Sequence, residues 1–187
     1  MSQPVVANPI WAEVLQLVPV IVLAFPVVTT GQVDLTSMGQ AFPLAAALVL
    51  PVTVAVRWRG AVLNPILLGT ALWLILGAVG FGLEVPVLRD LWTRWQGFAL
   101  FLSVLPTLLV AMATPWGAIG ALGPKPWVRG RSAVLVGCAC IAVAWSWGFQ
   151  HDVRLGGGLP FIALNIVRRV LIAHGVRAMK DTHTLDE

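Results

Sequence analysis

The sequence predicts an all-α polytopic membrane protein, a bundle of six transmembrane helices with both termini in the cytoplasm. Hydrophobic residues make up 58% of the 187 residues, and Asp, Glu, Lys and Arg together only 11%. Soluble domains are about 45–50% apolar and about 25% charged. The apolar residues also gather in six runs close to the length of about 20 residues that a helix needs to cross a bilayer. This composition excludes a soluble globular domain, a disordered chain and a nucleic-acid-binding module.

The first two predicted spans are Pro9–Thr29 and Gln40–Val56. The residues before the first span lack the basic region of a cleaved signal peptide, and Glu13 follows, so we expect this span to remain in the mature protein. Prolines lie inside both spans, for example Pro43 and Pro51 in the second. Each proline removes a helix hydrogen bond, and we therefore expect kinks.

The third and fourth predicted spans are Ala61–Leu83 and Trp95–Thr114. The third carries glycines at helical spacing, which allow close approach of another backbone, and we expect a helix-packing face there. This face comprises Gly69, Gly77 and Gly80. Between the two spans, Val85–Gln96 has apolar residues at helical spacing, which indicates a short amphipathic helix lying on the membrane surface.

The last two predicted spans are Ser132–Phe149 and Leu155–Ala173. The glycines and proline at the start of the sixth run leave an alternative open, a short re-entrant segment followed by an interfacial helix. The connections between spans are short, so consecutive helices should pack as neighbours. We expect residues 1–180 to form one transmembrane domain and Asp181–Glu187 to form a mobile polar tail.

The distribution of cationic residues predicts the orientation. With both termini inside, nine of the twelve Lys and Arg residues lie on the cytoplasmic side, as the positive-inside rule requires. This asymmetry favours a multi-pass protein of the bacterial inner membrane. The cations near the end of the sixth span are candidates for contact with anionic lipid headgroups. They are Arg168, Arg169, Arg177 and Lys180.

Two polar side chains mark a candidate substrate or ion path. Glu13 and Gln16 lie one helical turn apart at the inner end of the first span. Ionisable groups at membrane depth are costly and are often functional, so this pair could receive a cation or a proton. The alternative is that Glu13 lies among the lipid headgroups beside Trp11.

Cofactor binding has two weaker candidates. His151 follows the fifth span and could ligate a metal or a haem iron, and Trp73, in the middle of the third span, could contact a bound cofactor or a neighbouring helix. The sequence identifies no particular cofactor. It contains no paired-His motif, Cys cluster, phosphate loop or serine nucleophile elbow, so we predict no catalytic residue and no metal site.

The stretch from Leu68 to Val110 contains the motif LGAVGFG, a short charged connector and the motif WQGFALFL. It resembles part of the bacterial septation-protein-A-like family of multi-pass membrane proteins. The resemblance covers less than a quarter of the chain. Its motifs consist of glycine and apolar residues, and we transfer no functional residue from it.

These features favour a non-catalytic membrane subunit or assembly factor. Such a protein would contact membrane lipids, other integral membrane subunits or pigments through its apolar helix faces, and it would bind no nucleic acid. The alternative is a small-solute or ion transporter or channel, in which proline-kinked helices line a path that begins at Glu13 and Gln16.

Overall fold

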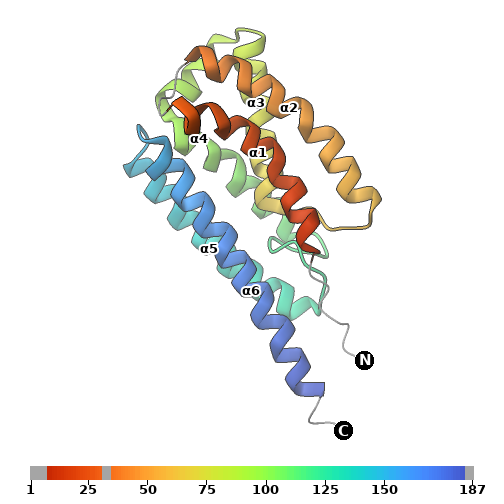
Figure 1. Cartoon of the computed structure of the whole chain (residues 1–187). Helices are drawn as coiled ribbons and strands as arrows, with labels where there is room; N and C mark the ends of the chain where they lie inside the picture. The colour runs from red at the N-terminus through yellow and green to blue at the C-terminus, as the bar shows by residue number, and fades with distance from the viewer. Residues whose placement is uncertain (1–7, 31–34, 184–187) are drawn as a thin grey trace.

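A computed structural model describes residues 8–30 and 35–183, with side chains at 8–25, 39–95 and 97–176. Its regular structure is helical, and the described residues form no strand, as the sequence predicts. Six α-helices and one π-helical turn follow one another along the chain (Figure 1). They are α1 (Ile10–Thr30), α2 (Leu35–Trp58), α3 (Pro65–Gly82), α4 (Pro86–Met112), α5 (Lys125–Gly148), η1 (Val153–Gly158) and α6 (Leu159–His183).

Each α-helix packs against the next one in the sequence, as expected from the short connections. The hydrophobic core has two main parts. One lies between α3, α4, α5, α6 and the turn before α5, and the other between α1, α2, α3 and α4. Because α3 and α4 contribute to both parts and pack most extensively on each other, this pair holds the two halves of the bundle together.

Several helices are long and apolar enough to cross a membrane. In the described part of the chain they are Gly39–Trp58, Pro65–Gly82, Lys125–Gly148 and Val153–Val176. A bent α4 adds a fifth if its two parts count as one span, and the described apolar part of α1, Ile10–Phe25, is shorter. The helices therefore indicate a multi-pass membrane protein with four or five candidate spans, where the sequence predicts six.

Helix α4 is bent by 105° between Pro86–Trp95 and Gly97–Met112. The first part covers the segment predicted as a separate amphipathic helix, and the second covers most of the predicted fourth span. At the bend Gly97 touches η1, since a Cβ atom built on it would lie 2.4 Å from the backbone nitrogen of Gly157. No side chain fits between the two backbones, so the contact requires glycine at position 97.

The candidate span Val153–Val176 begins with the π-helical turn η1 and continues as α6. The Asp152 carboxylate caps this turn by accepting hydrogen bonds from the backbone N–H groups of Arg154 (2.8 Å) and Leu155 (3.0 Å). The Ser146 hydroxyl of α5 donates to the carbonyl oxygen of Gly156. The glycines that weaken the sequence pattern of the sixth span thus form a turn anchored to α4 and α5. Helix α6 extends to His183, so it includes the first residues of the predicted tail, and residues 184–187 lie outside the described residues.

Candidate functional site: a buried carboxylate between two arginines

The first turn of α1 places a carboxylate between two guanidinium groups of α6. Oε1 of Glu13 lies 2.7 Å from Nη1 of Arg168, and Oε2 lies 2.7 Å from Nη2 of Arg169. The side chains of Glu13 and Arg168 are 11% and 1% exposed, whereas that of Arg169 is 54% exposed. Oε1 therefore accepts a charge-assisted hydrogen bond from Arg168, and Oε2 forms a salt bridge with Arg169.

Arg168 is also held by backbone carbonyl oxygens in the turn between α4 and α5. Its Nε donates to the carbonyl of Ile119 at 2.7 Å, and its Nη2 to the carbonyl of Gly120 at 3.5 Å. Gly120 has a φ of +61°, and a Cβ there would lie 2.7 Å from Cδ of Pro65. Only glycine combines this backbone conformation with the available space, so the turn that binds Arg168 depends on it.

A chain of amide groups extends the polar cluster towards α3. Oε1 of Gln16 accepts a hydrogen bond from the backbone N–H of Asn64 at 2.8 Å, and its Nε2 donates to the carbonyl of Ala12 at 2.9 Å. The Asn64 side chain caps α3 by accepting from the N–H of Ile66, and it donates to Oδ1 of Asn165 on α6 at 3.2 Å. The cluster thus joins α1, α3 and α6.

Glu13 and Gln16 share one face of α1, as expected for a candidate path, but their polar atoms are already engaged. Both oxygens of Glu13 and both polar atoms of Gln16 have partners within the chain. The polar atoms of Glu13 and Gln16 are therefore satisfied by partners inside the bundle. In an open ion path, these atoms would be free to bind an ion. The other expectation, that Glu13 lies among lipid headgroups, does not fit its burial of about nine-tenths.

Contrary to the predicted headgroup contact, Arg168 is 0% exposed in the structure, where the carboxylate of Glu13 occupies its guanidinium group. A buried guanidinium costs less when a carboxylate and backbone carbonyls replace its water, and Arg168 has both. Arg169 remains half exposed beside it. Arg177 and Lys180 lie outside the residues whose side chains are described. The sequence carries one signal of this ion pair. It has a carboxylate in the first predicted span and an arginine in the last, and each is energetically costly at membrane depth unless it is paired.

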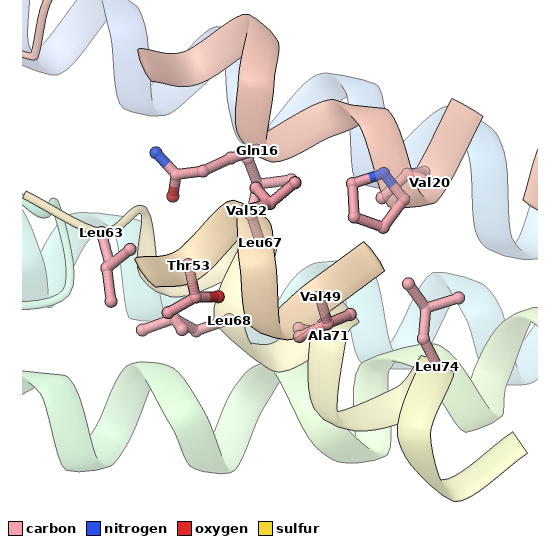
Figure 2. A pocket seen from close by; sticks show the side chains of 11 residues that line it. Gln16, Val20, Val49, Val52, Thr53, Leu63, Leu67, Leu68, Ala71 and Leu74 are labelled. Atoms are coloured by element: carbon pink, nitrogen blue, oxygen red, sulfur yellow. The ribbon is translucent and has the colours of Figure 1, made fainter. Parts of the chain in front are cut away.

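A small cavity adjoins Gln16 between α1, α2 and α3 (Figure 2). The cavity has a volume of about 20 Å³, which is enough for roughly one water molecule. Gln16 and Thr53 are the polar residues of its lining, and aliphatic side chains such as Val20 and Leu67 form most of the rest. Because Gln16 already has two partners, this cavity resembles a packing defect more than a binding pocket.

Trp73, in the middle of α3, belongs to an aromatic cluster shared with α2 and α4. Its ring centroid lies 5.1 Å from that of Phe42 and 5.7 Å from that of Trp92, and Phe81 stacks on Phe42 at 5.5 Å. Gly77 makes room for the cluster, since a Cβ there would lie 2.3 Å from the Phe42 ring. Trp73 is therefore engaged with aromatic rings of the chain.

The other singled-out residues lie apart from the buried cluster. Gly69 packs against α4, where its Cβ would lie 2.6 Å from Cα of Val104, and Gly80 packs against Leu88 in the same way at 2.8 Å. His151 is exposed in the loop before η1. Within the described residues, no three His, Cys, Asp or Glu side chains are grouped so that they could hold a metal ion.

Comparison of the chain with models of known protein families, with curated proteins and with solved structures found no match. The resemblance of residues 68–110 to the septation-protein-A-like family thus has no support from a family match. The features that bear on function are therefore the apolar helices and the ion pairs of Glu13.

Proposed function

We propose that this protein is a non-catalytic integral membrane subunit or assembly factor that packs against other membrane helices, lipids or pigments. The observation that carries the proposal is that the buried carboxylate of Glu13 and the buried guanidinium of Arg168 neutralise each other inside the bundle. This pair and the neighbouring amide groups tie α1, α3 and α6 together, as expected of a scaffold.

The outer surfaces of the helices supply the contact area that such a role needs. Large apolar side chains are exposed on all six α-helices. Ile141 of α5 is 70% exposed and Ile162 of α6 is 58% exposed. In a bilayer such faces contact either lipid tails or the faces of neighbouring helices, and shape and small residues decide between the two.

We further propose six spans with both termini in the cytoplasm of a bacterial cell. α1 has 21 residues over Ile10–Thr30, which suits a membrane crossing, and with the bent α4 it brings the number of spans to six. Figure 1 shows α1 and α6 running in opposite directions, with α1 beginning beside the middle of α6, on the side toward which α6 runs to the lower end of the molecule. An even number of spans requires this arrangement, and the clustering of cations predicts that this end faces the cytoplasm.

Transport of a small solute or ion is the second candidate. The bend of α4 at Gly97 contacts the π-helical turn η1. Many transporters contain broken helices of this kind, which line the substrate cavity. The engagement of Glu13 and Gln16 within the bundle favours the first proposal. If Glu13→Gln changes flux into proteoliposomes while Asp90→Asn, an exposed carboxylate of α4, leaves it unchanged, transport becomes the better account.

The test of the accessory role is site-specific photo-crosslinking in the native membrane. A photoreactive residue at Ile141, which is 70% exposed, should form a defined adduct with another membrane protein, and one at Ala139, which is 0% exposed, should not. The adduct should match a species that co-migrates with the chain in a native gel. A monodisperse monomer in mild detergent, with only lipid adducts at Ile141, would count against the proposal.

A further inference from the structure

The structure shows Arg168 and Arg169 already holding a two-oxygen anion, the carboxylate of Glu13. Each oxygen lies 2.7 Å from the nearest guanidinium nitrogen of a different arginine. Carboxylate and phosphate groups offer arginine the same kind of acceptor pair, and guanidinium groups bind both. The pair of arginines is thus shaped to accept an oxyanion, and the occupant in this structure belongs to the chain itself.

The buried arginine keeps its position through contacts that do not involve Glu13. Nε and Nη2 of Arg168 donate to the carbonyls of Ile119 and Gly120, which leaves Nη1 for the anion. Since these carbonyls belong to a turn fixed by the positive φ of Gly120, the cationic side of the site persists when the carboxylate moves. Such preorganisation reduces the cost of binding an external anion.

Helix α1 also has attachments that are independent of Glu13. The side chain of Asn8 exchanges hydrogen bonds with the backbone of Val62, donating to its carbonyl and accepting from its N–H at 2.8 Å. Gln16 accepts from the N–H of Asn64. The start of α1 is thus anchored on both sides of Glu13 by contacts that do not involve its carboxylate.

The charge balance leaves the site attractive to a second anion. Two guanidinium groups face one carboxylate, so the trio carries a net charge of +1, and the excess lies on Arg169, whose side chain is 54% exposed. The exposed guanidinium of Arg169 is thus the part of the trio that an anion can reach from the surface. The entry point and the buried half of the site are adjacent residues of α6.

We propose that Arg168 and Arg169 form a binding site for a phosphate group, and that Glu13 occupies this site as an internal ligand until the phosphate displaces it. The phosphate belongs either to an anionic lipid headgroup or to a small soluble molecule, because both present the same oxygens to the arginines. This assignment is separate from the accessory role, since the site would bind phosphate whether or not the chain has protein partners.

The test uses the full chain, purified without lipid in an uncharged detergent, and two probes: short-chain phosphatidylglycerol and inorganic phosphate. Short-chain phosphatidylcholine serves as the uncharged lipid control. Glu13→Gln removes the competing charge and is expected to lower the Kd of at least one probe by about tenfold, or 1.4 kcal/mol. Asp90→Asn makes the same change at an exposed carboxylate and should leave the Kd at the wild-type value. Adding Arg169→Gln to Glu13→Gln should abolish the gain.

The outcomes separate the two sources of phosphate. A gain for phosphatidylglycerol alone supports a lipid headgroup, and a gain that includes inorganic phosphate supports a small soluble ligand. Equal affinities of Glu13→Gln and Asp90→Asn for both probes would overturn the proposal, as would a gain that survives Arg169→Gln. If Glu13→Gln does not fold, Glu13→Asp replaces it, because the shorter carboxylate cannot reach both guanidinium groups, and the same comparison with Asp90→Asn decides.

Discussion

The ion pairs of Glu13 allow a quantitative prediction, because its two partners differ sharply in burial. Glu13→Ala leaves Arg168, with a side chain only 1% exposed, without its counter-charge. At about 4 Å between charge centres and an effective dielectric constant of about 20, one such pair is worth about 4 kcal/mol. Removing one partner of a buried pair costs about 3–5 kcal/mol. We therefore expect Glu13→Ala to lower the free energy of unfolding by that amount.

Arg169→Ala provides the matched comparison at the same carboxylate. Its side chain is 54% exposed, so solvent screens the interaction and exposed pairs contribute about 0–1 kcal/mol. The same N···O distance of 2.7 Å in both pairs makes burial the variable that the comparison tests. We expect Arg169→Ala to cost no more than about 1 kcal/mol.

Both variants can be measured by reversible unfolding in mixed micelles, followed by the fluorescence of the nine tryptophans. A double-mutant cycle of Glu13→Ala with Arg168→Met isolates the buried pair, and its coupling energy should be several times that of the cycle with Arg169→Ala. Equal losses in Glu13→Ala and Arg169→Ala, or a loss below about 1 kcal/mol in Glu13→Ala, would refute the reasoning from burial.

Three further predictions concern packing, capping and topology. Gly69→Ala should cost about 1–3 kcal/mol, because the new Cβ would lie 2.6 Å from the α4 backbone, whereas Gly130→Ala, with nothing within 4 Å, should be neutral or stabilising in the same thermal unfolding assay. Asn64→Ala should lower the free energy of unfolding by about 1–2 kcal/mol, because it removes the N-cap of α3. Hydrogen exchange should then show faster exchange of the backbone amides at the start of α3. In a background without the native cysteines, Arg89→Cys and Arg129→Cys should react with an impermeant thiol reagent from opposite faces of membrane vesicles. Labelling from one face would exclude the proposed topology.

The helical fold was predictable from the sequence because a membrane helix needs a long run of apolar residues. Such a run identifies the helix even when its first and last residues are known only approximately. The separate amphipathic character of Val85–Gln96 also anticipated the part of α4 that precedes the 105° bend. At the bend Gly97 lies against the backbone of Gly157. Residues so far apart in the chain carry no local signal of their contact.

The candidate site was predictable only in part. The cost of a carboxylate at membrane depth singled out Glu13, and helical spacing placed Gln16 on the same face. The sequence predicts Arg168 at the membrane surface because long cationic side chains usually reach water there. Its burial follows from carbonyl oxygens in a turn whose shape depends on the positive φ of Gly120. Side-chain spacing along α6 could not reveal acceptors supplied by another segment.

The ion pair between Glu13 and Arg168 joins residues 155 positions apart, so its two halves are synthesised at different times. Until α6 is inserted, the nascent chain carries an uncompensated carboxylate near the start of its first helix. Completion of the last helix is therefore the step that neutralises the first. A chain truncated before Arg168 would keep the apolar helices α1 to α5 but would leave the Glu13 carboxylate without its buried counter-charge.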